Sequence, residues 1–122
     1  IYDQMVYTPT DCTGPEGVAA NGTITWSGGD ARYVYILEAG SANPTVPPNL
    51  DLPQGTLWRI DVPYTGTPVA SGVHYGQLPA GTTQRFPATG APAALVSGRR
   101  YYINVQQDVG IPITRCMFTY PR

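Results

Sequence analysis

The hydrophobic and polar residues of this chain alternate in short stretches, and no window keeps the spacing of three and four that predicts a helix. The clearest stretch begins at Tyr101, because Tyr101, Ile103 and Val105 share one face of an extended chain. This period of two predicts a half-buried strand. The turn signal Ser97-Gly98 precedes it, so Tyr101 is expected to bury its ring while its hydroxyl reaches a backbone carbonyl of the preceding connection.

The same alternation predicts further strands, separated by turns rich in Gly and Pro. The predicted strands cover residues 1–10, 23–27, 32–38, 56–62, 73–78, 82–86, 95–107 and 113–120. Segment 32–38 is apolar on both faces, so it is expected in the middle of a sheet or with one face covered by a neighbour or a partner. Segment 56–62 places Arg59 and Asp61 on a face that is expected to lie in water. The dipeptide Asn21-Gly22 predicts a tight turn.

Together these elements predict an all-β fold, an antiparallel two-sheet sandwich of about seven to eight strands. The 122 residues fit a single domain spanning residues 1–122. A Pro-rich segment at about 39–55 is expected to be an insertion in this domain. Connections of this length are either functional or partly disordered, and the sequence leaves both interpretations open.

Two cysteines, Cys12 and Cys116, lie near opposite ends of the chain. We expect a disulfide between them, which points to an oxidising compartment. The alternative is a reactive or metal-binding thiol. It is disfavoured because the chain has no Cys-x-x-Cys pair and its single histidine, His74, is far from both cysteines in sequence.

The charges of the chain bear on its partners. All seven basic residues are arginines, scattered along a chain of net charge −1, so no basic stripe is available to neutralise a phosphate backbone. We therefore expect no nucleic-acid partner. No apolar run approaches the roughly 18 to 20 residues that cross a bilayer, so no transmembrane segment is expected. The absence of Lys is a weak indication of bacterial origin.

The sequence offers few residues that could carry out catalysis. A triad of a serine with His74 and Asp61 would need a nucleophile elbow, and the chain contains no Gly-x-Ser-x-Gly. Asp51 and Asp61 could in principle flank a sugar, but nothing in the pattern brings them together. The other aspartates are isolated beside turn residues, so we expect no enzyme activity, no cofactor and no metal site.

The surface aromatics are the strongest candidates for a binding site. Several of five tyrosines are expected to face outward, where tyrosine favours protein interfaces and sugar-stacking platforms. These candidates are Tyr33, Tyr35, Tyr64, Tyr75 and Tyr102. Tyr102 is expected to point away from the core on a central strand. The alternative is cross-strand aromatic pairing on a solvated face, without any ligand.

The stretch Leu95-x-Ser97-Gly98-x-x-Tyr101-x-Ile103-x-Val105 resembles the end of the fifth-to-sixth strand connection in fibronectin type III domains. Trp26 matches the tryptophan of the second strand in that family. The resemblance implies an accessory or adhesive role without catalysis. An immunoglobulin-like sandwich of another subtype is the alternative.

The sequence therefore suggests a noncatalytic, exported bacterial surface or secreted domain that mediates protein–protein interaction or self-assembly. The alternative is a carbohydrate-binding module that uses exposed aromatic residues on one sheet face. An enzyme would require a pocket that holds His74 and a carboxylate. The chain begins at Ile1 rather than Met, so a leader or tag is expected to have preceded it. The expected location is secreted, periplasmic or at the cell surface, with lipoprotein anchoring left open.

Overall fold

The chain folds into β-strands in the part that the structure describes. This computed structural model describes residues 7–44 and 52–122, which contain eight strands and no helix. The strands are β1 (Gly17–Val18), β2 (Thr23–Thr25), β3 (Tyr33–Glu38), β4 (Thr56–Asp61), β5 (Val73–His74), β6 (Thr83–Phe86), β7 (Arg100–Asp108) and β8 (Ile111–Thr119). The predicted all-β fold of seven to eight strands is confirmed.

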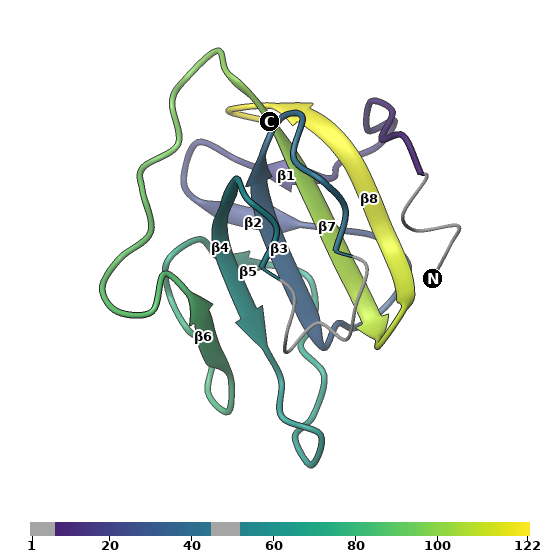
Figure 1. The fold of residues 1–122 in the computed structure, drawn as a ribbon, viewed down its shortest axis with the longest axis vertical. Coiled ribbons are helices and arrows are strands. Elements are labelled where there is room, and N and C mark those ends of the chain that lie inside the picture. The colour runs from purple at the N-terminus through teal and green to yellow at the C-terminus, as the bar shows by residue number, and fades with distance from the viewer. Residues whose placement is uncertain (1–6, 45–51) are drawn as a thin grey trace.

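The strands form two antiparallel sheets packed as a sandwich. One sheet has the order β1-β2-β5, and the other has the order β6-β4-β3-β7-β8 and faces the viewer in Figure 1. The core between them combines side chains of both sheets. Its largest members include Trp26, Trp58, Tyr101, Ile103 and Val105, which are all at most 4% exposed.

Strand β3 lies at the centre of the five-stranded sheet. It pairs with β4 on one side and with β7 on the other, so that Val34 is flanked by Ile60 and Val105. The prediction that this strand lies in the middle of a sheet is confirmed. Its two apolar faces follow from this position, because a central strand can be covered on both sides.

The predicted turn at Asn21-Gly22 joins β1 to β2. The Gly22 amide donates to the Ala19 carbonyl (2.8 Å), and the Asn21 side-chain oxygen accepts from the Thr23 amide (3.0 Å). Gly22 has a φ of +92°, and a Cβ at this position would lie 2.6 Å from the His74 ring. Both the backbone conformation and the contact with His74 therefore require glycine here.

Tyr101 buries its ring as predicted, but its hydroxyl bonds a different group. The hydroxyl oxygen accepts a hydrogen bond from the Val96 amide (2.7 Å) rather than donating to a backbone carbonyl. The Val96 carbonyl already accepts the Arg99 amide of the turn (3.1 Å). The Tyr101 hydroxyl therefore pairs with the Val96 amide and the Arg99 amide pairs with the Val96 carbonyl, so both backbone groups of Val96 are hydrogen-bonded.

The N-terminal segment is bound to the last strand by sulfur and by backbone. Cys12 and Cys116 form the predicted disulfide. The Cys12 amide donates to the Met117 carbonyl, and the Met117 amide donates to the Thr10 carbonyl, both at 2.8 Å. The strand predicted over residues 1–10 is not found at residues 7–10, where Pro9 has no amide hydrogen to donate. Residues 1–6 lie outside the described part of the chain.

The Pro-rich connection begins and ends close to the predicted limits, since β3 ends at Glu38 and β4 begins at Thr56. The Glu38 amide donates to the Gly55 carbonyl (2.8 Å) and closes the base of the connection. Residues 45–51 within it lie outside the described residues. Within residues 7–44 and 52–122, no helix is long and apolar enough to span a membrane.

The disulfide gives a first testable prediction. Replacing Cys12 and Cys116 together by alanine should lower the free energy of unfolding by about 2 to 5 kcal/mol, because the unfolded chain loses a cross-link over 104 residues. Urea denaturation of the double variant and of the wild type measures this difference. The wild type treated with a reductant should match the variant, and a difference below about 1 kcal/mol would contradict the prediction.

Candidate binding site at one end of the sandwich

The register of the five-stranded sheet brings four strand ends together. Tyr33, at the start of β3, pairs with Asp61 at the end of β4 and with Gln106 near the end of β7, and Gln106 pairs with Pro112 of β8. Neighbouring strands are about 4.8 Å apart, so the connections that leave these ends project side by side. We call this end of the molecule the loop end; it is lowest in Figure 1 and comprises residues 27–32, 62–72 and 109–111.

The loop end carries the most exposed large apolar side chains of the described residues. Tyr64 is 95% exposed, Ile111 51% and Val109 50%. Val96 is 49% exposed and precedes β7 at the opposite end of the sheet, whereas Leu78 is 48% exposed and belongs to the connection that leads into β6. We call Tyr64, Val109 and Ile111 the apolar tip.

The turn that carries Tyr64 is held by hydrogen bonds from a single arginine, Arg32. Arg32 Nη1 donates to the carbonyls of Pro63 (3.1 Å), Tyr64 (3.4 Å) and Gly66 (3.1 Å). The Gly66 amide closes the turn on the Pro63 carbonyl at 2.7 Å. Tyr64 is therefore presented to solvent on a turn already ordered by the fold, which lowers the entropic cost of binding a partner.

A pocket of about 380 Å³ opens beside Tyr64, within the usual range for small-molecule sites. It is lined by Tyr33, Asp61, Val62, Pro63, Tyr64, Thr83 and Arg85. Apolar and hydrogen-bonding side chains both face it. Two of the five tyrosines predicted as binding residues thus meet in one site.

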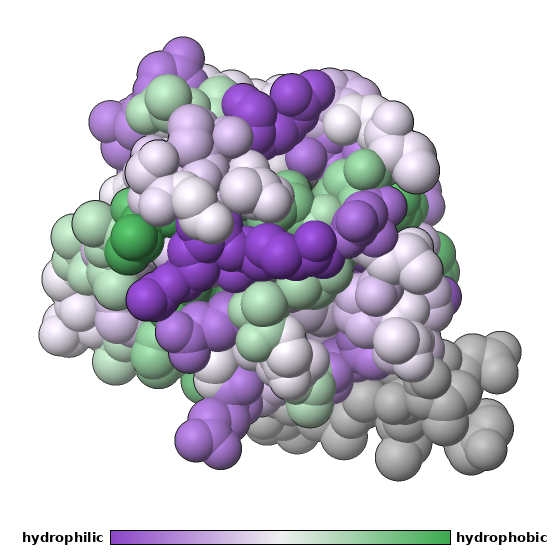
Figure 2. Space-filling view, turned by 90° about the horizontal axis from the view of Figure 1, so that it is seen from above, coloured by the Kyte–Doolittle hydropathy of each residue, from purple (hydrophilic) through white to green (hydrophobic). Residues whose placement is uncertain are grey.

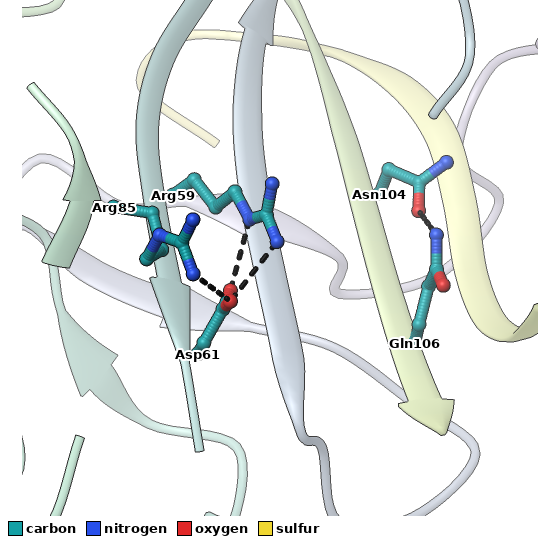
Figure 3. A network of polar contacts seen from close by, with 5 residues as sticks. All are labelled: Arg59, Asp61, Arg85, Asn104 and Gln106. Atoms are coloured by element: carbon teal, nitrogen blue, oxygen red, sulfur yellow. Dashed lines mark hydrogen bonds and ion pairs between the residues drawn. The ribbon is translucent and has the colours of Figure 1, made fainter. Parts of the chain in front are cut away.

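A buried ion pair supports this pocket (Figure 3). Arg59 donates to both carboxylate oxygens of Asp61 at 2.9 Å, and Arg85 Nη1 lies 3.7 Å from the same carboxylate. The Arg59 guanidinium also lies 5.0 Å from the centre of the Tyr35 ring. Arg59 is 0% exposed and Asp61 7%, so the predicted wet face of β4 is wrong. The charge of Arg59 tolerates burial because a carboxylate and an aromatic ring surround it.

The same face continues across β7 as a chain of hydrogen bonds. The Tyr102 hydroxyl donates to Asn43 Oδ1 (2.5 Å) and accepts from Asn104 Nδ2 (3.0 Å). Gln106 Nε2 donates to Asn104 Oδ1 at 3.3 Å, as Figure 3 shows. Burial raises the pKa of Tyr102 to about 12.

The expectation that Tyr35 and Tyr102 face outward is therefore wrong. Both point away from the core between the sheets, as predicted for Tyr102, but both are 0% exposed. They pack together in a second hydrophobic cluster with Leu37. Asn43, from the connection between β3 and β4, contributes to the cover of this face. An aromatic sugar platform on the open sheet face would require exposed rings, so these two tyrosines do not supply one.

Tyr75, the remaining tyrosine candidate, lies on the core side of the sandwich. Its ring packs edge-on against Trp58 at 5.4 Å, and its hydroxyl donates to the Ala93 carbonyl at 2.8 Å. Burial raises its pKa. Tyr75 thus acts in packing and does not join Tyr33 and Tyr64.

The groups considered for catalysis are not brought together. His74 lies on β5 of the three-stranded sheet, whereas Asp61 lies on β4 of the other sheet and binds Arg59. Asp51, the proposed partner of Asp61, lies outside the described residues. The sulfurs of Cys12 and Cys116 lie close to the Glu16 carboxylate, but they form the disulfide and offer no thiolate to a metal.

The opposite end of the sandwich, seen in Figure 2, is crossed by a band of strongly hydrophilic side chains. A cavity of about 270 Å³ lies there among charged residues. Arg100 pairs with Asp11 across it. Glu16 accepts from the Ser27 hydroxyl (2.8 Å), which lowers the pKa of Glu16, and the positive charge of Arg122 acts in the same direction. The two carboxylates that line this cavity, Asp11 and Glu16, thus both have partners within the protein.

Sequence reasoning found Tyr33 and Tyr64 but missed Arg32 and Arg85. The sequence did carry one signal. Segment 32–38 is apolar on both faces and therefore needs a partner face, and segment 56–62 carries Arg59 and Asp61 together on one face. Comparison of the chain with models of protein families, with curated proteins and with solved structures finds no match in any of the three. The grounds for a function are therefore the contents of the loop end.

The ion pair gives a second prediction. Asp61→Asn should lower the free energy of unfolding by about 3 to 5 kcal/mol, because buried Arg59 loses its bidentate partner. The apolar double variant Arg59→Met/Asp61→Leu should lie closer to the wild type, because it buries no charge. Urea denaturation measures both variants. If Asp61→Asn proved as stable as the wild type, the pair would not support this face.

The tyrosines give a third prediction, on alkaline pH. The pKa values of Tyr33, Tyr75 and Tyr102 are raised from 10.0, for Tyr33 by burial first and then by the charges of Asp61 and Asp108. The folded chain therefore binds these protons more tightly than the unfolded chain. The free energy of unfolding should be level below pH 10 and fall as the pH rises to 12 and beyond.

Urea denaturation at a series of pH values, with phenolate absorbance followed in parallel, measures this fall. Tyr102→Phe should reduce the slope, because one of the three phenols is removed. A free energy of unfolding that stayed constant from pH 9 to pH 12 would show that these hydroxyls are not protected by the fold.

Proposed function

We propose that this chain is a noncatalytic, exported binding domain that recognises a partner protein through its loop end. The observation that carries this proposal is that the three most exposed large apolar side chains, those of the apolar tip, share that end. Exposed apolar groups gathered at one place are typical of interaction sites, whereas scattered ones are ordinary. Tyrosine is also among the residues that dominate binding energy in interfaces.

The support for Tyr64 as an anchor comes from its turn. Three carbonyls of the turn are bound by Arg32, so the tyrosine does not have to order its own backbone on binding. A rigid aromatic side chain on an ordered loop is also the device that antibody paratopes use. The turn therefore favours a recognition role over a merely solvated surface.

The strand order supports a fibronectin type III-like or immunoglobulin-like assignment. In immunoglobulin sandwiches, strands A, B and E share one sheet and strands C, F and G share the other. Here β1, β2 and β5 share one sheet and β3, β7 and β8 share the other. The connections 27–32 and 109–110 then correspond to the B–C and F–G loops, which form the binding end of antibody variable domains. The apolar tip lies at the equivalent end.

Export is supported by the disulfide between Cys12 and Cys116, since such bonds persist in oxidising compartments. We propose a secreted, periplasmic or cell-surface location, and a bacterial origin that fits the absence of Lys. A noncatalytic role is supported by the separation of His74 from Asp61 on different sheets.

A test of this function is a binding comparison with three proteins. The wild type, the tip variant Val109→Asp/Ile111→Asp and the control Val96→Asp are immobilised and exposed to envelope and secreted proteins of the source cells. The wild type and the control should retain the same partner, and the tip variant should retain it at least about tenfold more weakly. Val96 is a matched control because it is similarly exposed (49%) but precedes the start of β7, at the end of the sheet opposite the loop end.

Sedimentation of the three proteins alone distinguishes self-assembly from binding to another protein. If only the wild type and the control self-associate, the partner is a second copy of the chain. If the wild type neither retains a protein nor self-associates, the proposed function is wrong. Equal loss of binding in Val96→Asp would place the interface elsewhere.

A further inference from the structure

We propose that the pocket beside Tyr64 binds a neutral sugar ring. This inference goes beyond the proposed protein interaction, because it concerns another class of ligand and depends on pocket residues rather than on Val109 and Ile111. It also differs from an aromatic platform on the sheet face, since Tyr35 and Tyr102 are buried there.

One side of the pocket is apolar. Val62, Pro63 and the Tyr64 ring line it, and the Tyr64 side chain is 95% exposed. A pyranose presents a face of C–H groups that packs on an aromatic ring. The Arg32 contacts fix the backbone of the turn, so the position from which Tyr64 projects is set before a ligand arrives.

The other side of the pocket supplies hydrogen bonds of both kinds. The hydroxyls of Tyr33 and Thr83 can donate and accept, the Arg85 guanidinium donates, and the Asp61 carboxylate accepts. The Arg85 side chain is 37% exposed and lines the pocket beside Asp61. The Tyr33 phenol is protonated at neutral pH, and burial raises its pKa further. Sugar hydroxyls, which also donate and accept, match such a surface.

The charges of the pocket favour a neutral ligand. Asp61 is bound by Arg59 on both oxygens and lies 3.7 Å from Arg85, so the charged groups of the pocket already pair with one another. A ligand carboxylate would have to compete with Asp61 for an arginine, and a ligand amine would have to compete with an arginine for Asp61. Neutral hydroxyls can bind at the remaining donor and acceptor positions without displacing an ion pair.

The size of the pocket limits the ligand. A volume of about 380 Å³ lies near the lower end of the range for small-molecule sites. It therefore fits one ring, or the end of a short oligosaccharide, rather than a long chain. Binding through a single ring is expected to be weak, with a Kd on the order of 1 mM.

Titration calorimetry with defined trisaccharides tests the proposal. The neutral probes are cellotriose, xylotriose, mannotriose and maltotriose, and the charged probes are trigalacturonate and chitotriosamine. At least one neutral trisaccharide should bind. Tyr64→Ala, at a side chain too exposed to affect folding, should weaken this binding at least about tenfold, and Tyr33→Phe, which removes only a hydroxyl, about three- to tenfold.

The control is Arg99→Gln. Arg99 is exposed and directly precedes β7, at the end of the five-stranded sheet opposite the pocket, so this variant should bind as the wild type does. Circular dichroism confirms that each variant is folded. Binding of no neutral probe, or equal binding by Tyr64→Ala, overturns the proposal. Tighter binding of trigalacturonate or chitotriosamine than of every neutral probe overturns the assignment of a neutral ligand.

The two proposals can fail separately. Loss of the partner protein in Val109→Asp/Ile111→Asp bears on the protein interface alone. Weakened sugar binding in Tyr33→Phe bears on the pocket alone, since Tyr33 is not part of the apolar tip.

Discussion

The bidentate contact between Arg59 and Asp61 determines how the outer face of the five-stranded sheet can be buried. A guanidinium with no solvent exposure is tolerated only if its charge and its hydrogen bonds are matched nearby. The partner carboxylate lies two residues along the same strand, and the Tyr35 ring lies on the neighbouring strand. The contact also fixes Asp61 beside Tyr33, so the wall of the binding pocket is set by an interaction that belongs to the sheet itself.

The two faces of this sheet are buried by different chemistry. The inner face meets the three-stranded sheet through apolar side chains such as Trp58 and Ile103. The outer face holds Arg59, Tyr102 and Asn104 in polar contacts, with Asn43 from a long connection contributing to its cover. Neither face therefore offers an open surface to a ligand at these positions. The recognition site that we propose therefore lies at the loop end, where the connections leave the sheet.

The sequence predicted the features that depend on local pattern. Alternation identified the strands other than β1 and the central position of β3, and the dipeptide Asn21-Gly22 identified a turn. It could not predict the burial of Arg59, because that depends on the register that sets Tyr35 beside it. The sequence also placed Tyr64 and Tyr102 in the same list of outward-facing candidates. Their opposite exposure arises from contacts between segments distant in the chain, such as that between Asn43 and Tyr102.

The disulfide between Cys12 and Cys116 gives the domain an uncommon response to mechanical force. The bond spans 104 residues, so β1 to β7 lie within a covalent ring. A pull on the two ends of the chain is transmitted through the sulfur bridge and bypasses the hydrogen bonds between those strands. Of the described residues, only 7–11 and 117–122 lie outside this ring and can be peeled away under tension. A domain built in this way can carry load while its loop end keeps its shape.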